Sequence, residues 1–319
     1  MADELQIVAK RSPLRRLTGV QIVGTGSFLP DNVVTNEALA SLGCDAEWII
    51  QRTGIRERRH APPEMCTSDM AVEAAERCIA SADIDRRDID MLVLGTLSPD
   101  YLLPATATTV QDRLGLNCAA MDVSAACAGF MYAMVTGMQF VATGASKCAL
   151  VIGADTNSRV MNPADKKTYP LFGDGAGAVL VTKGSSEQGL LSYTLGADGS
   201  GDRLLVRPVG GTREPLDPNG GGGDLFVKMD GRPVFKCGCW KILRCRCLRR
   251  AGTASTTWAS GCFTRPTSAF STRRPTRWAS IARRSSRIST ATATRRPAAC
   301  RSRSMNRCAP AGLAAAICC

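Results

Sequence analysis

The first 236 residues are predicted to form an α/β fold, and two observations support this. Short apolar runs rich in β-branched residues alternate with longer segments of helical period, which is typical of a mainly buried sheet flanked by helices. Residues 128–142 are apolar on nearly every side, and a helix of that kind is usually buried. Residues 237–319 do not share the pattern.

Five strands are expected in order along this first part, and helices are expected between them. Ser68 can cap a helix in which apolar residues recur at three- and four-residue steps up to Ala82. Pro104 can start a second helix at its first turn. From Leu190 onward the chain becomes rich in glycine, which indicates turns and surface loops. The expected strands are Val20 to Phe28, Met91 to Thr96, Ala119 to Val123, Cys148 to Gly153 and Ala178 to Thr182.

Charge and cysteine divide the 319 residues into two unlike parts. The whole chain has a formal charge of +12, but all 28 acidic residues lie between Asp3 and Asp230. Residues 1–236 therefore carry −5 and residues 237–319 carry +17, with six and nine cysteines respectively. The overall charge does not describe a single basic domain, and the two parts are expected to differ in origin.

The amino-terminal residues do not resemble a secretory signal. Asp3 and Glu4 stand where a signal would be basic, and no apolar segment follows them. No stretch approaches the roughly 18 apolar residues of a membrane span. We therefore expect a cytoplasmic, reducing location in which the six cysteines of the first part are free thiols.

Cys127 is the candidate nucleophile because it lies between an expected buried strand and the apolar helix. The positive end of a helix dipole and the free N–H groups there favour a thiolate, and small neighbours leave room for a carbonyl group. The alternative is a buried structural cysteine, which is common. The structural interpretation is preferred for the cysteines that lack this placement, namely Cys44, Cys66, Cys78, Cys118 and Cys148.

Four motifs around this cysteine occur in a defined order, and together they are specific. They run from Gly24 to Pro30, from Glu47 to Arg58, from Asp122 to Phe130 and from Phe172 to Gly177. They resemble beta-ketoacyl-acyl-carrier-protein synthase III of the thiolase superfamily. The resemblance implies a thiolase-like layered α/β fold. It divides the chain into an extension (1–18), an amino-terminal half (19–188), the start of a second half (189–236) and a basic tail (237–319).

The resemblance also implies an activity and the residues that carry it. Cys127 would take an acyl group from a short acyl-CoA, such as acetyl-CoA, and condense it with malonyl-acyl-carrier protein to start fatty-acid synthesis. No cofactor or metal is expected, and the partners would be acyl-CoA, acyl carrier protein and a second copy of the chain. Trp48 and Arg52 match positions that hold the CoA nucleotide, by stacking and by charge. The other positions implied to contact substrate are Leu103 in the acyl pocket, the loop of Phe172, Gly173, Asp174 and Gly175, and Gly231.

Two of these assignments have a simpler structural alternative. Trp48 could be a core aromatic residue. Asp174 could be a turn carboxylate that binds nearby backbone N–H groups.

The family also requires a His and an Asn from the second half, and this sequence lacks them. The one histidine, His60, follows a run with three arginines and is expected to be a solvated loop residue. A one-base shift of reading frame near Cys237 explains the loss. Read one base away, Phe263 to Thr267 can encode His-Gln-Ala-Asn, and Thr290 to Arg296 can encode Arg-Tyr-Gly-Asn-Thr-Ser. The same shift restores acidic residues, so the tail is interpreted as frameshifted and disordered.

Three alternatives to the synthase stay open. A related condensing enzyme, of the chalcone-synthase or hydroxymethylglutaryl-CoA-synthase type, fits the Glu47 to Arg58 motif less well. The frameshifted product could lack catalysis altogether, because its second half is replaced. The tail of charge +17 could bind an anionic surface or nucleic acid, although it has few aromatic residues and no recognition fold.

Overall fold

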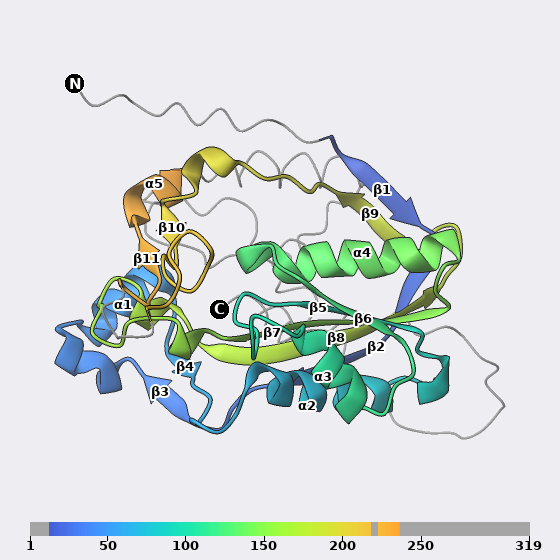
Figure 1. The fold of residues 1–319 in the computed structure, drawn as a ribbon, viewed down its shortest axis with the longest axis horizontal. Helices are drawn as coiled ribbons and strands as arrows, with labels where there is room; N and C mark the ends of the chain where they lie inside the picture. The colour runs from blue at the N-terminus through green and yellow to red at the C-terminus, as the bar shows by residue number, and fades with distance from the viewer. Residues whose placement is uncertain (1–12, 218–222, 237–319) are drawn as a thin grey trace, which may run out of the picture.

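A five-stranded mixed sheet is the centre of the computed structural model, which describes residues 13–217 and 223–236 (Figure 1). The strand order is β2-β8-β7-β5-β6. Strands β5, β6 and β7 are parallel, whereas β8 is antiparallel to both of its neighbours. The strands are β2 (Val20–Phe28), β5 (Met91–Gly95), β6 (Ala119–Val123), β7 (Cys148–Thr156) and β8 (Asp174–Lys183). All five predicted strands are therefore confirmed, and β7 and β8 extend beyond their predicted ends.

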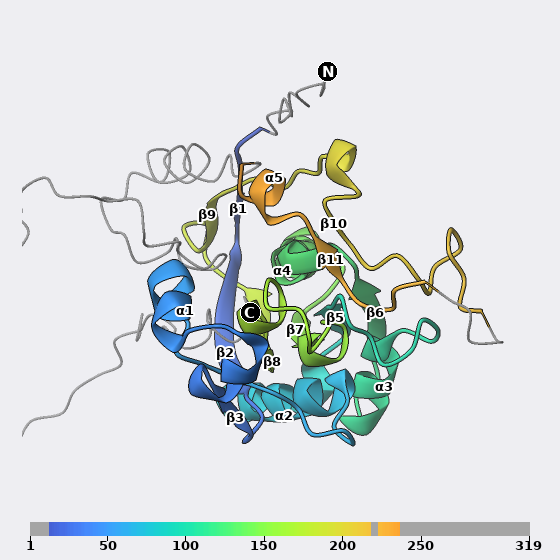
Figure 2. The same ribbon diagram turned by 90° about the vertical axis from the view of Figure 1, so that its left-hand side faces the viewer.

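Helices cover both faces of this sheet (Figures 1 and 2). Helix α2 (Thr67–Ala80) and helix α3 (Thr106–Arg113) lie on one face, and helix α4 (Gly129–Thr143) lies on the other. The central strand β7 supplies Leu150 and Ile152 to the first core and Val151 to the second. Burial on both faces explains why this strand is a nearly continuous apolar run.

The predicted starts of two helices are wrong, for one reason. The N-cap of α2 is Cys66, and Ser68 lies inside the first turn. The N-cap of α3 is Ala105, and Pro104 precedes it. In each case a carboxylate from a distant residue accepts hydrogen bonds from N–H groups of the first turn. Asp100 accepts from the N–H of Ser68, and Asp122 of β6 accepts from the first two N–H groups of α3. Tertiary capping of this kind leaves no local signal in the sequence.

Helix α4 is buried on one side only, which differs from the all-round burial that its composition predicts. Ala133, Gly137 and Val141 face the sheet and are buried, whereas Met131 and Tyr132 are half-buried. The segment Ala126–Thr143 is long and apolar enough to cross a membrane by length and composition, and a third of it is buried. The prediction that no stretch approaches such a span is therefore wrong by length and composition, because Ala, Val, Met and Phe raise the mean hydropathy of this segment. Its packing on β5 and β7 is that of a core helix.

Shorter elements surround the sheet, and the sequence did not predict them. Three antiparallel pairs form, and one of them, β1 with β9, joins the end of the predicted extension to the glycine-rich region after Gly189. The pairs are β1 (Arg15–Thr18) with β9 (Gly189–Tyr193), β3 (Val33–Thr35) with β4 (Glu57–Arg59), and β10 (Leu205–Val206) with β11 (Lys228–Met229). The helices are α1 (Ala46–Thr53), α5 (Gly231–Lys236) and the 3-10 turns η1 (Glu37–Leu42), η2 (Arg86–Asp88), η3 (Ala126–Ala128), η4 (Asn157–Arg159), η5 (Tyr169–Leu171) and η6 (Gly199–Gly201). The prediction for the tail, residues 237–319, lies outside the described residues.

Candidate active site around Cys127

Cys127 lies in the short turn η3 that connects β6 to α4, and its side chain is exposed. The preceding residue, Ala126, has a φ of 46°, which is the left-handed region that a residue with a Cβ rarely adopts. Such a conformation costs about 1–2 kcal/mol and persists only where the surroundings impose it. The turn therefore holds the thiol outward at the amino end of α4, where the sequence placed Cys127 without predicting its exposure.

The other cysteines of the described region lie elsewhere in the fold and are free thiols. Cys44, Cys78 and Cys148 are buried, and Cys66 and Cys118 are half-buried. Burial raises the pKa of Cys78 and of Cys148 to about 12, and it also raises the pKa of Cys118. Exposure therefore separates Cys127 from the buried thiols, which agrees with the structural role predicted for them.

Two glycines bring the nucleophile turn close to the sheet. A Cβ placed on Gly95, the last residue of β5, would lie 2.5 Å from the carbonyl carbon of Gly129 and 2.7 Å from the nitrogen of Phe130. The amino end of α4 thus rests directly on the backbone of β5. No larger residue fits at Gly95 without moving one of the two elements.

The carboxyl ends of β5, β6 and β7 meet at one end of the sheet, where β8 also begins and α1 and α5 lie (Figure 1). Ligands of open α/β sheets bind at such ends. The structure therefore gathers the predicted Phe172–Gly175 loop and the helix that carries Trp48 at the end of the molecule where Cys127 is exposed.

The loop before β8 is an internal part of this end rather than an open surface. Gly173, Asp174 and Gly175 are buried, and Phe172 is half-buried. The Asp174 carboxylate accepts hydrogen bonds from the N–H of Ala61 (2.7 Å) and from the N–H and Oγ of Ser158 (2.8 and 2.6 Å). These contacts give Asp174 a structural role, but its donors come from segments distant in the sequence and not from the nearby backbone of a turn.

Trp48 and Arg52 form an exposed pair on α1. The Trp48 side chain is 49% exposed, so the alternative of a core aromatic residue does not hold. The Arg52 guanidinium carbon lies 5.9 Å from the centre of the indole ring, a cation–π distance. The Asp45 carboxylate caps the helix through the N–H groups of Glu47 and Trp48. The pair is held on a defined helix and can be reached by a ligand.

Leu103 belongs to an exposed apolar loop between β5 and α3. It is 86% exposed, and Tyr101 and Leu102 beside it are also exposed. The loop is anchored where it meets α3, because the N–H of Asp100 donates to the Thr106 hydroxyl. Gly231, the last of the predicted positions, is exposed at the start of α5.

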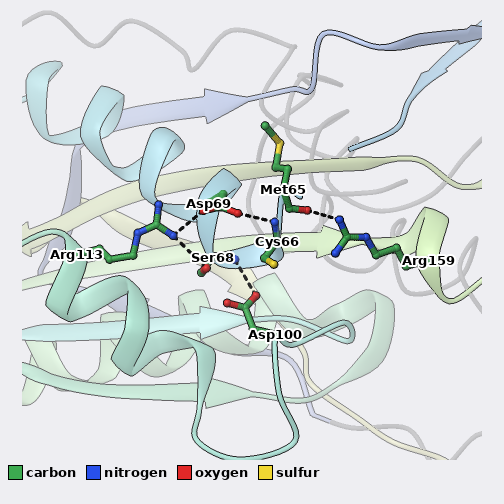
Figure 3. Close-up of polar contacts among 7 residues, drawn as sticks. All are labelled: Met65, Cys66, Ser68, Asp69, Asp100, Arg113 and Arg159. Carbon is green, nitrogen blue, oxygen red and sulfur yellow. Dashed lines mark hydrogen bonds and ion pairs between the residues drawn. The ribbon is translucent and has the colours of Figure 1, made fainter. Parts of the chain in front are cut away.

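The amino end of α2 is held by two arginines that the sequence did not single out (Figure 3). Arg113 of α3 donates to the carboxylate of Asp69 (2.7 Å) and to the Ser68 hydroxyl (3.2 Å). On the other side, Arg159 donates to the backbone carbonyls of Pro62, Pro63 and Met65. The Arg113 contacts join α3 to the first turn of α2, and the Arg159 contacts hold the loop that precedes α2.

His60 is buried, which corrects the prediction of a solvated loop residue. Its side chain is 8% exposed, and its Nδ1 lies 3.4 Å from the hydroxyl of Tyr169. Burial lowers the pKa of His60, and Arg58 lowers it further, while Asp174 opposes both. The prediction assumed that the neighbouring arginines are solvated. Arg58 instead points inward and donates to the carbonyl oxygen of the Asn36 side chain (2.6 Å).

The fold and the site define the class of protein: a thiolase-like layered α/β fold with a cysteine displayed at a strand-to-helix turn. The family described as 3-Oxoacyl-[acyl-carrier-protein (ACP)] synthase III matches residues 121–199, which include Cys127. The beta-ketoacyl-[acyl-carrier-protein] synthase III of Rhodopirellula baltica is 48% identical over 239 residues, which are 69% of each chain. The enzyme of the same name from Caldanaerobacter subterraneus is 45% identical over 218 residues, 67% of this chain and 66% of its own.

A solved structure supports the same assignment. The 3-oxoacyl-(acyl carrier protein) synthase III of Pseudomonas aeruginosa superposes with a TM-score of 0.66 at 36% identity, over 74% of this chain and 72% of its own. The chain belongs to the beta-ketoacyl-acyl-carrier-protein synthase III family of acyltransferases. It spans about two thirds of the length of these curated relatives.

Proposed function

We propose that this chain carries the acyl-accepting half of a beta-ketoacyl-acyl-carrier-protein synthase III. In this proposal Cys127 takes a short acyl group from acyl-CoA, and the complete enzyme condenses it with malonyl-acyl-carrier protein in the first step of fatty-acid synthesis. The exposed thiol of Cys127, at the amino end of α4, is the observation that carries the proposal. The names of the similar proteins support the acyl-carrier substrate.

The first reaction is an exchange of thioesters. The Cys127 thiolate attacks the carbonyl carbon of acyl-CoA, a new bond from carbon to Sγ forms, and the bond to the CoA sulfur breaks. The CoA thiolate that leaves takes up the proton lost from Cys127. The positive end of the α4 dipole would stabilise the negative oxygen of the tetrahedral intermediate.

The second reaction is a condensation that needs groups outside this site. Loss of CO₂ from the malonyl group leaves a carbanion, which attacks the acyl carbonyl on Cys127. The new carbon–carbon bond forms as the Cys127 thiolate is released. We expect this step to require the family's His and Asn donors. The in-frame sequence of residues 237–319 contains no histidine, and its one asparagine, Asn306, does not lie in a motif that resembles the family's.

Binding of the CoA portion is assigned to the pair on α1. The Trp48 ring would stack on the adenine, and the Arg52 guanidinium would bind a phosphate as a planar, permanently charged donor. Leu103 would line the acyl pocket where a second copy of the chain docks, and Gly231 would lie against the substrate. Phe172, Gly173 and Gly175 would shape the wall beside Cys127, while Asp174 holds that wall in place.

The experiment separates acyl transfer from condensation. The purified chain is incubated with acetyl-CoA and mapped by mass spectrometry for acetylated cysteine, and 3-oxoacyl product is then measured with malonyl-acyl-carrier protein. We expect acetylation at Cys127, its loss in Cys127→Ala, and no condensation. Cys66→Ser is the matched control, because Cys66 is a thiol at the start of another helix. Acetylation that is spread over several cysteines, or that persists in Cys127→Ala, would refute the assignment.

The lack of the second-half donors is itself a proposal with its own test. We infer a one-base shift near Cys237, and sequencing the DNA across the codons for residues 236–240 tests it. An intact in-frame reading would overturn it, as would condensation by the chain as printed. The alternative of anionic-surface binding by residues 237–319 predicts affinity for nucleic acid that falls steeply with salt and is lost on truncation after residue 236.

A further inference from the structure

We propose that Asp155 is a positioning residue for Cys127, because it holds the segment Thr96–Ser98 on which the nucleophile turn is built. The proposal rests on the proposed function only in taking Cys127 as the reacting group. Asp155 does not need to touch substrate, since it acts through the backbone that follows β5.

Asp155 collects three donors on a single oxygen. It lies near the carboxyl end of β7, and its Oδ1 accepts hydrogen bonds from the N–H of Leu97 (2.8 Å), from the hydroxyl of Thr96 (3.1 Å) and from the hydroxyl of Ser98 (3.2 Å). All three donors belong to consecutive residues that follow β5. One carboxylate therefore defines the path of the chain where it leaves the sheet.

Further contacts tie the same segment to β7 and α2. The N–H of Thr156 donates to the Ser98 hydroxyl (2.8 Å), and the Thr67 hydroxyl donates to the Ser98 carbonyl (2.6 Å). The hydroxyls of Thr67 and Thr156 are 2.7 Å apart. Thr67, Thr96, Ser98 and Thr156 are all buried, so these contacts are shielded from water.

The segment Thr96–Ser98 and the adjacent Gly95 also contact the chain on both sides of the turn that carries Cys127. The N–H of Thr96 donates to the carbonyl of Val123, the last residue of β6, four positions before Cys127. Gly95 packs backbone to backbone on Gly129, two positions after Cys127. The chain on each side of Cys127 is thus supported by residues next to the Asp155 donors. This support explains how Ala126 is kept at a φ of 46°.

The negative charge of Asp155 strengthens its hydrogen bonds to Thr96, Leu97 and Ser98 near pH 8. Burial raises the pKa of Asp155 to about 6, while the three donors in the segment oppose this rise. The side chain is therefore a carboxylate near pH 8, and hydrogen bonds to an ionised acceptor are stronger than those to a neutral one. Replacement by Asn keeps the size but removes the charge and adds a donor where only an acceptor is wanted.

Asp90 provides a matched control at the opposite end of the same strands. Its carboxylate also accepts three donors, from the Ser146 hydroxyl (2.5 Å) and from the N–H groups of Lys147 (2.9 Å) and Cys148 (3.3 Å). It lies just before β5 and beside the start of β7, whereas Asp155 lies where β7 ends. If a carboxylate at a strand end contributes only to the stability of the fold, replacing either Asp155 or Asp90 should affect Cys127 equally.

The experiment measures the reaction of Cys127 with iodoacetamide in the full chain, by peptide mass mapping at several pH values, for wild type, Asp155→Asn and Asp90→Asn. Thermal unfolding of each variant accompanies the measurement. We expect both variants to lose stability, but only Asp155→Asn to slow alkylation of Cys127, by about tenfold, because a displaced turn weakens the stabilisation of the thiolate by the amino end of α4. The pH at which its rate reaches half of the maximum should also move upward.

Other results would overturn the proposal. Equal slowing in both variants would mean a structural role alone, and an unchanged profile in folded Asp155→Asn would mean no role. Faster alkylation would mean that the carboxylate acts on Cys127 by charge repulsion and not by positioning. If Asp155→Asn does not fold, Ser98→Ala removes one donor from the same cluster and should slow Cys127 in the same direction, and no slowing would refute the idea. Absence of acetylation by acetyl-CoA in the wild type would count against the proposed function but not against this result.

Discussion

Replacing Gly95 by Ala tests the close approach of β5 and α4 that places Cys127. The added Cβ would lie 2.5 Å from the Gly129 carbonyl carbon and 2.6 Å from its oxygen, whereas ordinary contact begins at 3.4 Å. Both neighbours are backbone, so no side chain can turn away. The amino end of α4 must therefore move by about 1 Å, which loses contacts along the apolar face of the helix.

The expected cost follows from overpacking of a core. Inserting a methyl group into a well-packed site costs about 1–3 kcal/mol, and the lower chain entropy of Ala in the unfolded state offsets about 0.5–1 kcal/mol of this. Because both neighbours are backbone, the cost should lie in the upper part of this range, about 2–3 kcal/mol. We therefore expect a net loss of about 1–2.5 kcal/mol in the free energy of unfolding, and slower alkylation of Cys127. Urea unfolding and iodoacetamide kinetics on the same samples measure the two effects.

Gly199→Ala is the matched control for this change. A Cβ at Gly199 meets nothing within 4 Å, so this variant should unfold and react like the wild type. If Gly95→Ala matched that control within about 0.5 kcal/mol and kept the wild-type rate, the two elements would not be in the contact described here.

Two further predictions concern the buried titratable groups. His60 has a pKa below its ordinary value of 6.5 because of burial, so the unfolded chain binds a proton more readily and stability should fall as the pH drops below about 6.5. His60→Gln should reduce the change in the urea midpoint between pH 7 and pH 5. If the midpoint changed with pH as steeply as in the wild type, the burial of this side chain would be contradicted. Cys78 and Cys148, whose pKa is raised to about 12, should stay unmodified by iodoacetamide at pH 8 in the native chain and react once urea unfolds it. Native-state labelling of either thiol at the rate of an exposed cysteine would contradict their placement in the core.

Local pattern was sufficient for the sheet. Strands β2 and β6 match their predicted bounds, although β2 is only partly buried and no residue of β6 is fully buried. The same approach failed at the starts of α2 and α3, where the capping groups Asp100 and Asp122 come from other elements. It also missed β1 and β9, two short strands that are stabilised by each other and not by their own composition.

The position of Cys127 between a strand and a helix was predictable from the sequence, whereas the residues that support it were not. Cys127 was identifiable because a strand and an apolar helix meet there, and the four motifs pointed to the same family that the relatives confirm. The contacts of Asp155 and Arg159 had no such signal, since each side chain binds backbone that is distant in the sequence. The burial of His60 likewise depended on where Arg58 turned.

The sequence alone determined that an acidic, α/β-patterned part of the chain ends near residue 236 and that the basic tail contains no histidine. It also placed Cys127 between a strand and an apolar helix. Only the tertiary structure decided that Cys127 is exposed whereas Cys78 and Cys148 are buried. It also decided that Gly95 packs against the backbone of Gly129, and that Asp155 binds the segment Thr96–Ser98. The reason is that periodicity and composition report the average environment of a segment, whereas exposure, capping and strain depend on contacts between segments that only folding brings together.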